Sequence, residues 1–234
     1  MTKLATLHEY KWIALSCTSL GALFSVLNGT MLIIALPTIM KDLKVGMGIV
    51  MWILMSYMLA ITIFVPAIGR IADIKGRKKL YVSGAIVFTI GSLLCAFSST
   101  GIELLLFRII QAIGGSLLMA NSAPIVTDAF PKKELGKAMG INTMIISVAS
   151  VIGPILGGIL LSYGWRSIFL INVPFGILVS IWAGIQLKEL DVLPQHQTFD
   201  WKGTITFSIG MLAFLLALSF GGFIGWTNIY IYSF

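Results

Sequence analysis

Long apolar runs are the feature that most constrains how this chain can fold. Seven runs are long enough to span a bilayer: Trp12–Leu36, Gly48–Ile68, Leu80–Phe97, Ile102–Ile125, Ala138–Leu161, Ser167–Leu187 and Gly203–Gly225. A helix of about 20 residues crosses the roughly 30 Å hydrocarbon core. Because lipid offers the backbone no hydrogen-bond partner, each run is predicted to be a transmembrane helix. The expected fold is an all-α, polytopic membrane protein with seven transmembrane helices.

The composition supports a membrane protein rather than a soluble one. Hydrophobic residues make up 58% of the 234 residues and charged residues 11%, whereas an average soluble domain has roughly 45–50% and about 25%. The net charge of +7 would suggest a nucleic-acid partner if it lay on a soluble surface, but these cations lie in short segments between apolar runs. We therefore expect a lipid bilayer as the surroundings and no nucleic acid as a partner.

Residues that could carry catalysis or bind a metal are few. Cys17 and Cys95 both fall inside apolar runs, far from any Cys/His pattern, so we interpret them as small packing residues. The sequence has no paired carboxylates, no His cluster and no G-x-S-x-G stretch. We expect neither an enzyme nor a bound cofactor or metal.

Lys and Arg residues are distributed unevenly between alternate connections. Twelve lie on the side that carries the N-terminus and three lie on the other side. Since connections rich in Lys and Arg stay in the cytoplasm, the N-terminus is expected to be cytoplasmic, in the plasma membrane. The predicted organisation is a six-span bundle over 1–187, a cytoplasmic linker over 188–202, and a seventh span with an external tail over 203–234.

The connection between the second and third runs, GRIADIKGRKKL (Gly69–Leu80), concentrates charge. It contains five Lys or Arg residues and Asp73. Asp73 could accept hydrogen bonds at a helix start, or pair with Arg77 four residues later if the segment is helical. Gly76 permits a positive φ or a close helix approach. A solvated basic turn that only keeps the connection in the cytoplasm is the simpler alternative.

Three stretches resemble signatures of the major facilitator superfamily, each on the appropriate run. The loop GRIADIKGRKKL is similar to G-x-L-A-D-x-x-G-R-K, with Ile71 in place of Leu. The fourth run contains LLLFRIIQAIGG, similar to L-x-x-x-R-x-x-Q-G, with Arg108 and Gln111 in place and Ala112 for Gly. The fifth contains ASVIGPILGGIL, similar to the antiporter pattern G-x-x-x-G-P-x-x-G-G, with Ala149 for the leading Gly.

Two more stretches resemble the fourteen-span drug:proton antiporter branch of that superfamily. They are VLNGTMLIIALPTI in the first run and GWRSIFLINVPFG at the start of the sixth. The resemblance extends from about Gly21 to Trp226. It implies a transporter of which this chain is the N-terminal half, a six-helix bundle plus one additional span, with a central cavity that opens alternately to the two sides.

Polar residues inside the runs are candidates for the cavity. An arginine near the bilayer centre costs about 2.5–3.5 kcal/mol, so Arg108 should face a cavity or partner, unless it snorkels to the outer interface. The branch usually has an Asp where this chain has Asn28, and Asn cannot release a proton, which puts coupling at that position in doubt. Asn28, Arg108 and Gln111 are therefore predicted cavity or coupling residues. The remaining intramembrane asparagines, which could also be cavity groups but are expected to make helix–helix hydrogen bonds, are Asn121, Asn142 and Asn172.

Small residues in the fifth run predict close packing and a kink, because glycine removes bulk and Pro154 removes a backbone N–H. Packing alone would explain them, but the resemblance favours an interface that slides or bends against a partner from the other half. The predicted conformational-gating residues are Gly69, Asp73, Gly76, Arg77, Gly153, Pro154, Gly157 and Gly158.

The leading functional hypothesis is the N-terminal half of a secondary active transporter, an efflux antiporter for small amphipathic molecules or drugs, with proton coupling left open. Its expected partners are a small-molecule substrate, the bilayer and a missing C-terminal half, covalent or separate. The alternative is a truncated or split membrane protein that does not transport and needs a partner half.

Overall fold

The computed structural model describes residues 2–189 and 200–224, and every regular element in these ranges is an α-helix. This confirms the expected all-α class. The helices are α1 (Thr2–Asp42), α2 (Met47–Lys75), α3 (Arg77–Ala96), α4 (Gly101–Ala129), α5 (Lys132–Leu161), α6 (Ser167–Leu170), α7 (Asn172–Gln186) and α8 (Trp201–Ile224).

Six helical segments among the described residues are long and apolar enough to cross a membrane, with α6 and α7 counted together as Ser167–Gln186. They correspond to the first six predicted runs. The seventh run, Gly203–Gly225, falls on α8, which is helical but is not among these six. The count of seven spans therefore stays a prediction, and the tail at 226–234 lies outside the described residues.

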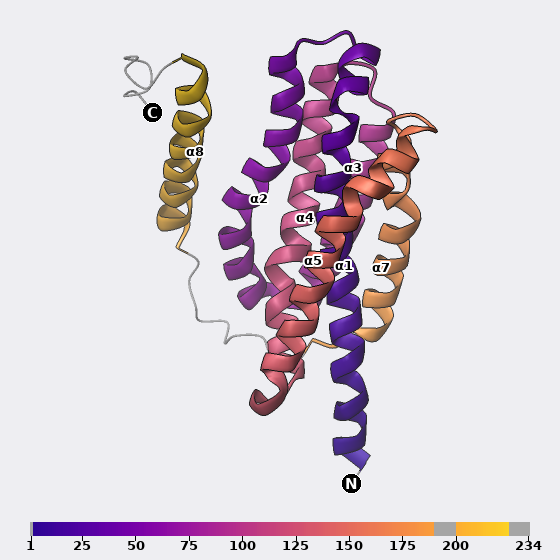
Figure 1. Ribbon diagram of the computed structural model, residues 1–234. Coiled ribbons are helices and arrows are strands. Elements are labelled where there is room, and N and C mark those ends of the chain that lie inside the picture. Colours follow the sequence, from indigo (N-terminus) through magenta and orange to yellow (C-terminus); the bar gives the residue numbers. More distant parts are fainter. Residues whose placement is uncertain (1, 190–199, 225–234) are drawn as a thin grey trace.

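The helices form a bundle around α1 and α4, which contact each other (Figure 1). α2 and α3 pack against α4, while α5 and α7 pack against α1, and α7 also contacts α3. α8 lies beside α2. In the apolar stretch of α1, 56% of the residues are buried, whereas in that of α5 only 17% are buried. α1 is therefore central, and α5 presents much of its surface outward.

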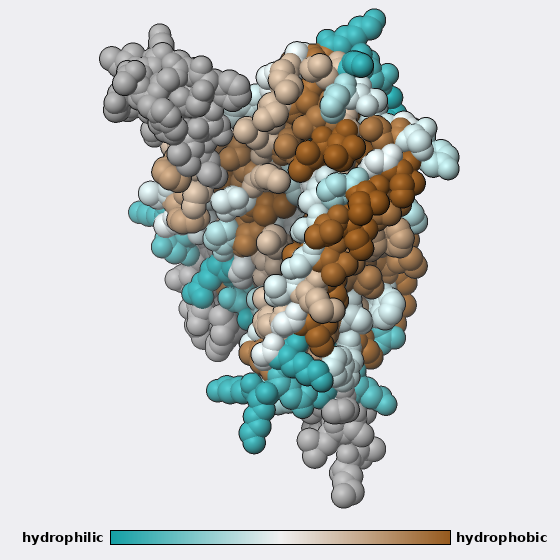
Figure 2. All heavy atoms as spheres, in the orientation of Figure 1, coloured by the Kyte–Doolittle hydropathy of each residue, from teal (hydrophilic) through white to brown (hydrophobic). Residues whose placement is uncertain are grey.

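The outer surface between the two ends is apolar, as a bilayer requires. Figure 2 shows hydrophobic side chains along α5, with hydrophilic ones gathered at both ends of the molecule. The large exposed side chains of α5 are Met144, Val148, Val151, Ile152, Ile155 and Ile159. Lipid or another apolar protein surface would cover this face at no desolvation cost.

Two contacts define which connections share an end of the bundle. Lys11 near the start of α1 pairs with Glu134 at the start of α5, and Arg77 at the start of α3 pairs with Asp128 at the end of α4. These segments, together with Leu187–Glu189, are called the basic end below. The α1–α2 connection lies at the opposite end (Figure 1), where Asp42 pairs with Arg166 at 2.8 Å.

The segment expected to connect the second and third runs is mostly helical, which corrects the sequence interpretation. α2 continues through the charged segment to Lys75, and Gly76 alone separates it from α3. Gly76 has φ +102°, a conformation that glycine adopts without the penalty that a Cβ would bring. The predicted loop is therefore a sharp corner between two long helices.

Glu103 lies at the start of α4, where it completes a helix cap. Thr100 Oγ1 accepts a hydrogen bond from the Glu103 N–H at 3.2 Å, and the Glu103 carboxylate accepts one from the Ser99 N–H at 2.8 Å. This reciprocal pattern satisfies N–H groups that the first helical turn leaves without partners. The acid nearest to Arg108 in the sequence thus has a capping role at the helix end.

Candidate functional site

A fully buried arginine connects the central helices. Arg108 of α4 is 0% exposed, and its Nη1 donates to Asn28 Oδ1 of α1 at 2.9 Å and to Gln111 Oε1 at 2.7 Å. Gln111 Nε2 in turn donates to Ser92 Oγ of α3 at 2.6 Å. The structure thus brings together the three predicted cavity residues, and we call these four side chains the Arg108 network. Since the guanidinium is enclosed by the bundle, it does not snorkel.

Two aromatic rings flank the guanidinium. Its Cζ lies 4.2 Å from the centroid of the Tyr57 ring of α2 and 5.9 Å from that of Phe169 of α6. Cation–π attraction of this kind becomes stronger when the cation is desolvated. Tyr57 is held in place by a 3.0 Å hydrogen bond between its hydroxyl and that of Ser25 of α1. Sequence reasoning missed both rings, because their approach to Arg108 depends on how each helix is rotated.

The Arg108 network has more donors than acceptors. Three of its buried nitrogens have no hydrogen-bond partner: Arg108 Nε, Arg108 Nη2 and Asn28 Nδ2. The ion pairs found among residues 2–189 and 200–224 all lie elsewhere and involve Lys11, Arg77 and Arg166. The centre of the bundle therefore holds a positive charge without a paired carboxylate.

Of the three other asparagines, one makes the expected contact between helices. Asn142 Oδ1 of α5 accepts a 3.1 Å hydrogen bond from Ser19 of α1. Asn121 and Asn172 instead donate to the carbonyl oxygens four residues earlier in the chain, those of Leu117 and Ile168. The prediction was wrong for these two, because a short polar side chain can bond to its own backbone instead of a neighbouring helix.

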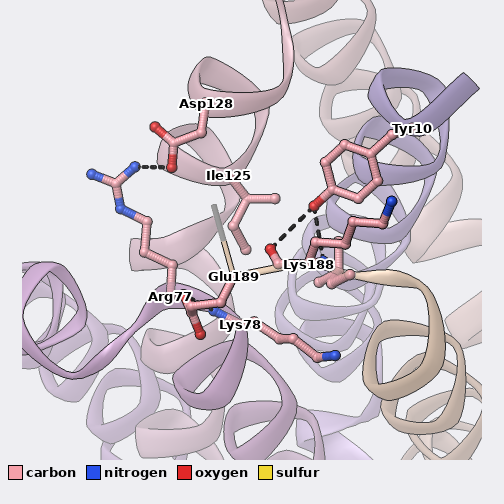
Figure 3. Close-up of a pocket in the computed structure, with 8 residues that line it drawn as sticks. Tyr10, Arg77, Lys78, Ile125, Asp128, Lys188 and Glu189 are labelled. Carbon is pink, nitrogen blue, oxygen red and sulfur yellow. Dashed lines mark hydrogen bonds and ion pairs between the residues drawn. The ribbon is translucent and has the colours of Figure 1, made fainter. Parts of the chain in front are cut away.

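A second charged network lies at the basic end. Arg77 donates to Asp73 Oδ1 from Nη2 at 2.9 Å and from Nε at 3.2 Å, so the expected pair forms, but it spans the corner at Gly76 and joins two helices. Its Nη1 also pairs with Asp128 of α4 (Figure 3). Asp128 was not singled out from the sequence, although its place at the end of the fourth run put it on the same side as the basic segment. We call Asp73, Arg77 and Asp128 the junction triad.

The start of the predicted linker lies against this junction. Glu189 Oε1 accepts a 3.2 Å hydrogen bond from the Lys78 N–H in the first turn of α3, and a Cβ on Gly76 would lie 2.6 Å from Glu189 Oε2. The Tyr10 hydroxyl accepts from the Lys188 N–H at 3.0 Å and donates to the Lys188 carbonyl at 3.2 Å. Figure 3 shows these side chains around one small cavity. Gly69, by contrast, has open space where a Cβ would point.

The small residues of α5 divide between two surfaces. A Cβ on Gly153 would collide with Thr30, and one on Gly157 would lie 2.8 Å from the Met31 carbonyl oxygen of α1. Gly158, one residue further, is exposed and would meet nothing within 4 Å. The helix that Gly153 and Gly157 pack against therefore belongs to the same bundle. A partner from another half remains a prediction for the Gly158 surface.

Comparison with known proteins places the chain among transporters. Residues 18–234 match the Major Facilitator Superfamily. The chain is 40% identical over 213 residues to the riboflavin transporter RibZ of Clostridioides difficile (strain 630), covering 90% of this chain and 46% of that protein. It is 39% identical over 204 residues to the multidrug transporter protein MdtP of Bacillus subtilis (strain 168), covering 85% and 37%. The chain spans less than half the length of these curated relatives.

The fold is also found among solved structures. A bacterial homolog to the human lysosomal transporter Spinster, in an inward-facing and unoccupied conformation, matches with a TM-score of 0.70 and 22% identity. The match covers 91% of this chain and 49% of the other. At this identity the likeness concerns the arrangement of helices.

The two neighbouring glycines of α5 allow a matched test of the α1–α5 contact. Gly157→Ala should lower the free energy of unfolding by about 1–3 kcal/mol, because the new methyl group is forced against the α1 backbone. Gly158→Ala should be neutral or slightly stabilising, since alanine favours the helix. Thermal unfolding of the purified chain in lipid nanodiscs measures both, and equal unfolding temperatures would contradict the packing described here.

The cap on α3 leads to a second prediction. Glu189→Ala should speed amide hydrogen exchange in the first turn of α3, because the Lys78 N–H loses its acceptor. Asp200→Ala is the matched control, since Asp200 accepts from the Gly203 N–H at 2.8 Å at the start of a different helix. Exchange in α3 that is the same in both variants would refute the contact.

Proposed function

Because the chain belongs to the major facilitator superfamily, we propose that it forms the N-terminal half of a secondary active transporter that exports small amphipathic molecules or drugs by alternating access. The observation that carries this proposal is the Arg108 network. Ionisable side chains are costly inside a membrane, and those that occur there usually mark the path of a substrate or ion. The curated relatives named as riboflavin and multidrug transporters support the substrate class.

The junction triad is assigned the role of a conformational gate. Arg77 joins the α2–α3 corner to α4, and Glu189 ties the same corner to the segment that follows α7. A rocking motion of one bundle against another must be transmitted through such rigid corners. The basic end is assigned to the cytoplasmic side of the plasma membrane, in line with the excess of Lys and Arg there.

Proton coupling requires a titratable group in the transport path. Position 28 holds Asn, which does not titrate. The acidic side chains that form ion pairs or caps in the described helices lie at the ends of those helices. If export is proton-driven, the coupling acid is therefore assigned to spans beyond α1–α7. Asn28→Asp should introduce or steepen a pH dependence of transport in a protein joined to a C-terminal half, and an unchanged pH profile would argue that coupling lies elsewhere.

The proposal requires a second half. This chain covers less than half of its curated relatives, and an interface between two bundles is where substrates bind in such transporters. We predict that the 234-residue chain transports nothing alone, which is also what a split, non-transporting protein would do. Joining it to the C-terminal part of the riboflavin transporter relative separates the two hypotheses.

That test is a flux measurement in proteoliposomes, with riboflavin and a panel of fluorescent dyes of either charge, with and without a pH gradient. We expect flux only from the joined protein. Flux from the chain alone would overturn the requirement for a second half and indicate that two copies act as the two halves. No flux from a folded, joined protein would favour the non-transporting alternative.

The gate assignment predicts a loss of rate without a loss of affinity. In the joined protein, Asp73→Asn and Asp128→Asn should each slow transport about tenfold, since a charge-assisted hydrogen bond is worth about 1.5–3 kcal/mol, while substrate affinity changes less than about threefold. Lys133→Gln, an exposed change at the same end, serves as the control. A large loss of affinity with normal turnover would contradict the assignment.

A further inference from the structure

All the acceptor oxygens of the Arg108 network are already in use. The side-chain oxygens of Asn28 and Gln111 both accept from Arg108 Nη1. Ser92 Oγ accepts from Gln111 and donates to the Phe88 carbonyl at 2.8 Å. These contacts fix the orientation of both amides, because an acceptor must face the guanidinium. Any group that completes the network has to supply acceptors.

The three nitrogens without partners are all donors. They belong to two side chains that are both 0% exposed, and Asn28 and Arg108 are joined by a 2.9 Å hydrogen bond. A buried donor that lacks an acceptor destabilises the fold, and the effect is larger for a charged group. A water molecule would satisfy a donor but would leave the charge of Arg108 uncompensated. A carboxylate supplies two acceptor oxygens and the missing negative charge, in the planar geometry that guanidinium favours.

The surroundings of the network are suited to an organic acid. Two aromatic rings, those of Tyr57 and Phe169, flank Arg108. An apolar groove of about 270 Å³ lies between α2, α4 and α8, and its lining includes Ser56, Ile109 and Leu212. Ser56 and Trp52 are the lining residues whose side chains carry polar atoms, and the rest of the groove is apolar.

We propose that the Arg108 network is a binding site for the carboxylate of a small apolar acid, whose body packs with the rings of Tyr57 and Phe169 beside the guanidinium. The inference rests on the proposed function and deepens it by naming the substrate class: organic anions, in preference to cations of similar size. Arg108 provides the charge and the planar donors, and Asn28 adds the amide donor. Asn28 takes this role because a carboxylate at position 28 would neutralise Arg108 internally and occupy the place of the ligand.

Direct binding to the purified chain in lipid nanodiscs tests the site without requiring transport. The probes are sodium benzoate, its neutral counterpart benzamide, and sodium chloride at the same concentration, measured by calorimetry and by the thermal unfolding temperature. We expect benzoate alone to bind and to raise the unfolding temperature. Equal responses to benzoate and benzamide, a response to chloride alone, or no response to any probe would overturn the proposal.

Two variants locate the response. Arg108→Gln and Asn28→Asp should each weaken benzoate binding by about tenfold or more, the loss expected for a charge-assisted contact. Asn28→Asp should by itself raise the unfolding temperature, because it supplies the missing carboxylate, so the test does not depend on Arg108→Gln folding. Arg166→Gln, which alters an arginine at the far end of the bundle, should leave benzoate binding unchanged. Benzoate binding that persists in Asn28→Asp would overturn the assignment.

Failure of this inference and failure of the proposed function give different results. Benzoate binding to the chain, with no flux in the joined protein, would keep the site and reject the transporter. Flux of dyes in the joined protein without any preference for acids, together with the absence of benzoate binding, would keep the transporter and reject the site.

Discussion

A guanidinium that cannot reach water organises the centre of this bundle. Arg108 contacts α1 through Asn28, α2 through the Tyr57 ring and α6 through the Phe169 ring, and Gln111 continues the network to α3. In an apolar bundle, packing forces are non-directional, whereas these polar contacts act only at one rotation of each helix. The relative rotation of five helices is therefore linked to a single charged side chain.

The two charged networks have different physical characters. The junction triad is partly exposed, with two carboxylates around one arginine and side-chain exposures of 16–28%, so its contacts can be exchanged for water at a lower cost than those of a fully buried charge. The Arg108 network is fully buried and has no carboxylate paired with its arginine among the described residues, so any change there must replace one partner by another. These two physical characters correspond to the conformational gate and the binding site that we propose.

Sequence reasoning predicted the features that depend on local spacing. The first six runs are membrane-length helices, and Asp73 pairs with Arg77 as expected, although the pair spans the corner at Gly76 and does not lie within one helix. It did not predict features that depend on how helices rotate and cross, such as the ring of Tyr57 over Arg108. It also mistook a charged helical segment for a loop, since charge density alone does not distinguish a solvated turn from a helix end. The Asp128 contact could have been predicted from topology, because both partners end on the same side.

The hydrogen bonds of Lys188 and Glu189 extend the six-helix bundle, as a folding unit, two residues beyond its last apolar run. Hydropathy places the boundary at Leu187, the last residue of the sixth apolar run, yet the next two residues contact Tyr10 and the first turn of α3. Anyone dividing the protein for separate expression, inserting a protease site or exchanging halves between relatives should cut after Glu189. A cut two residues earlier would preserve every membrane-length helix of the bundle and still remove a cap from its interior corner.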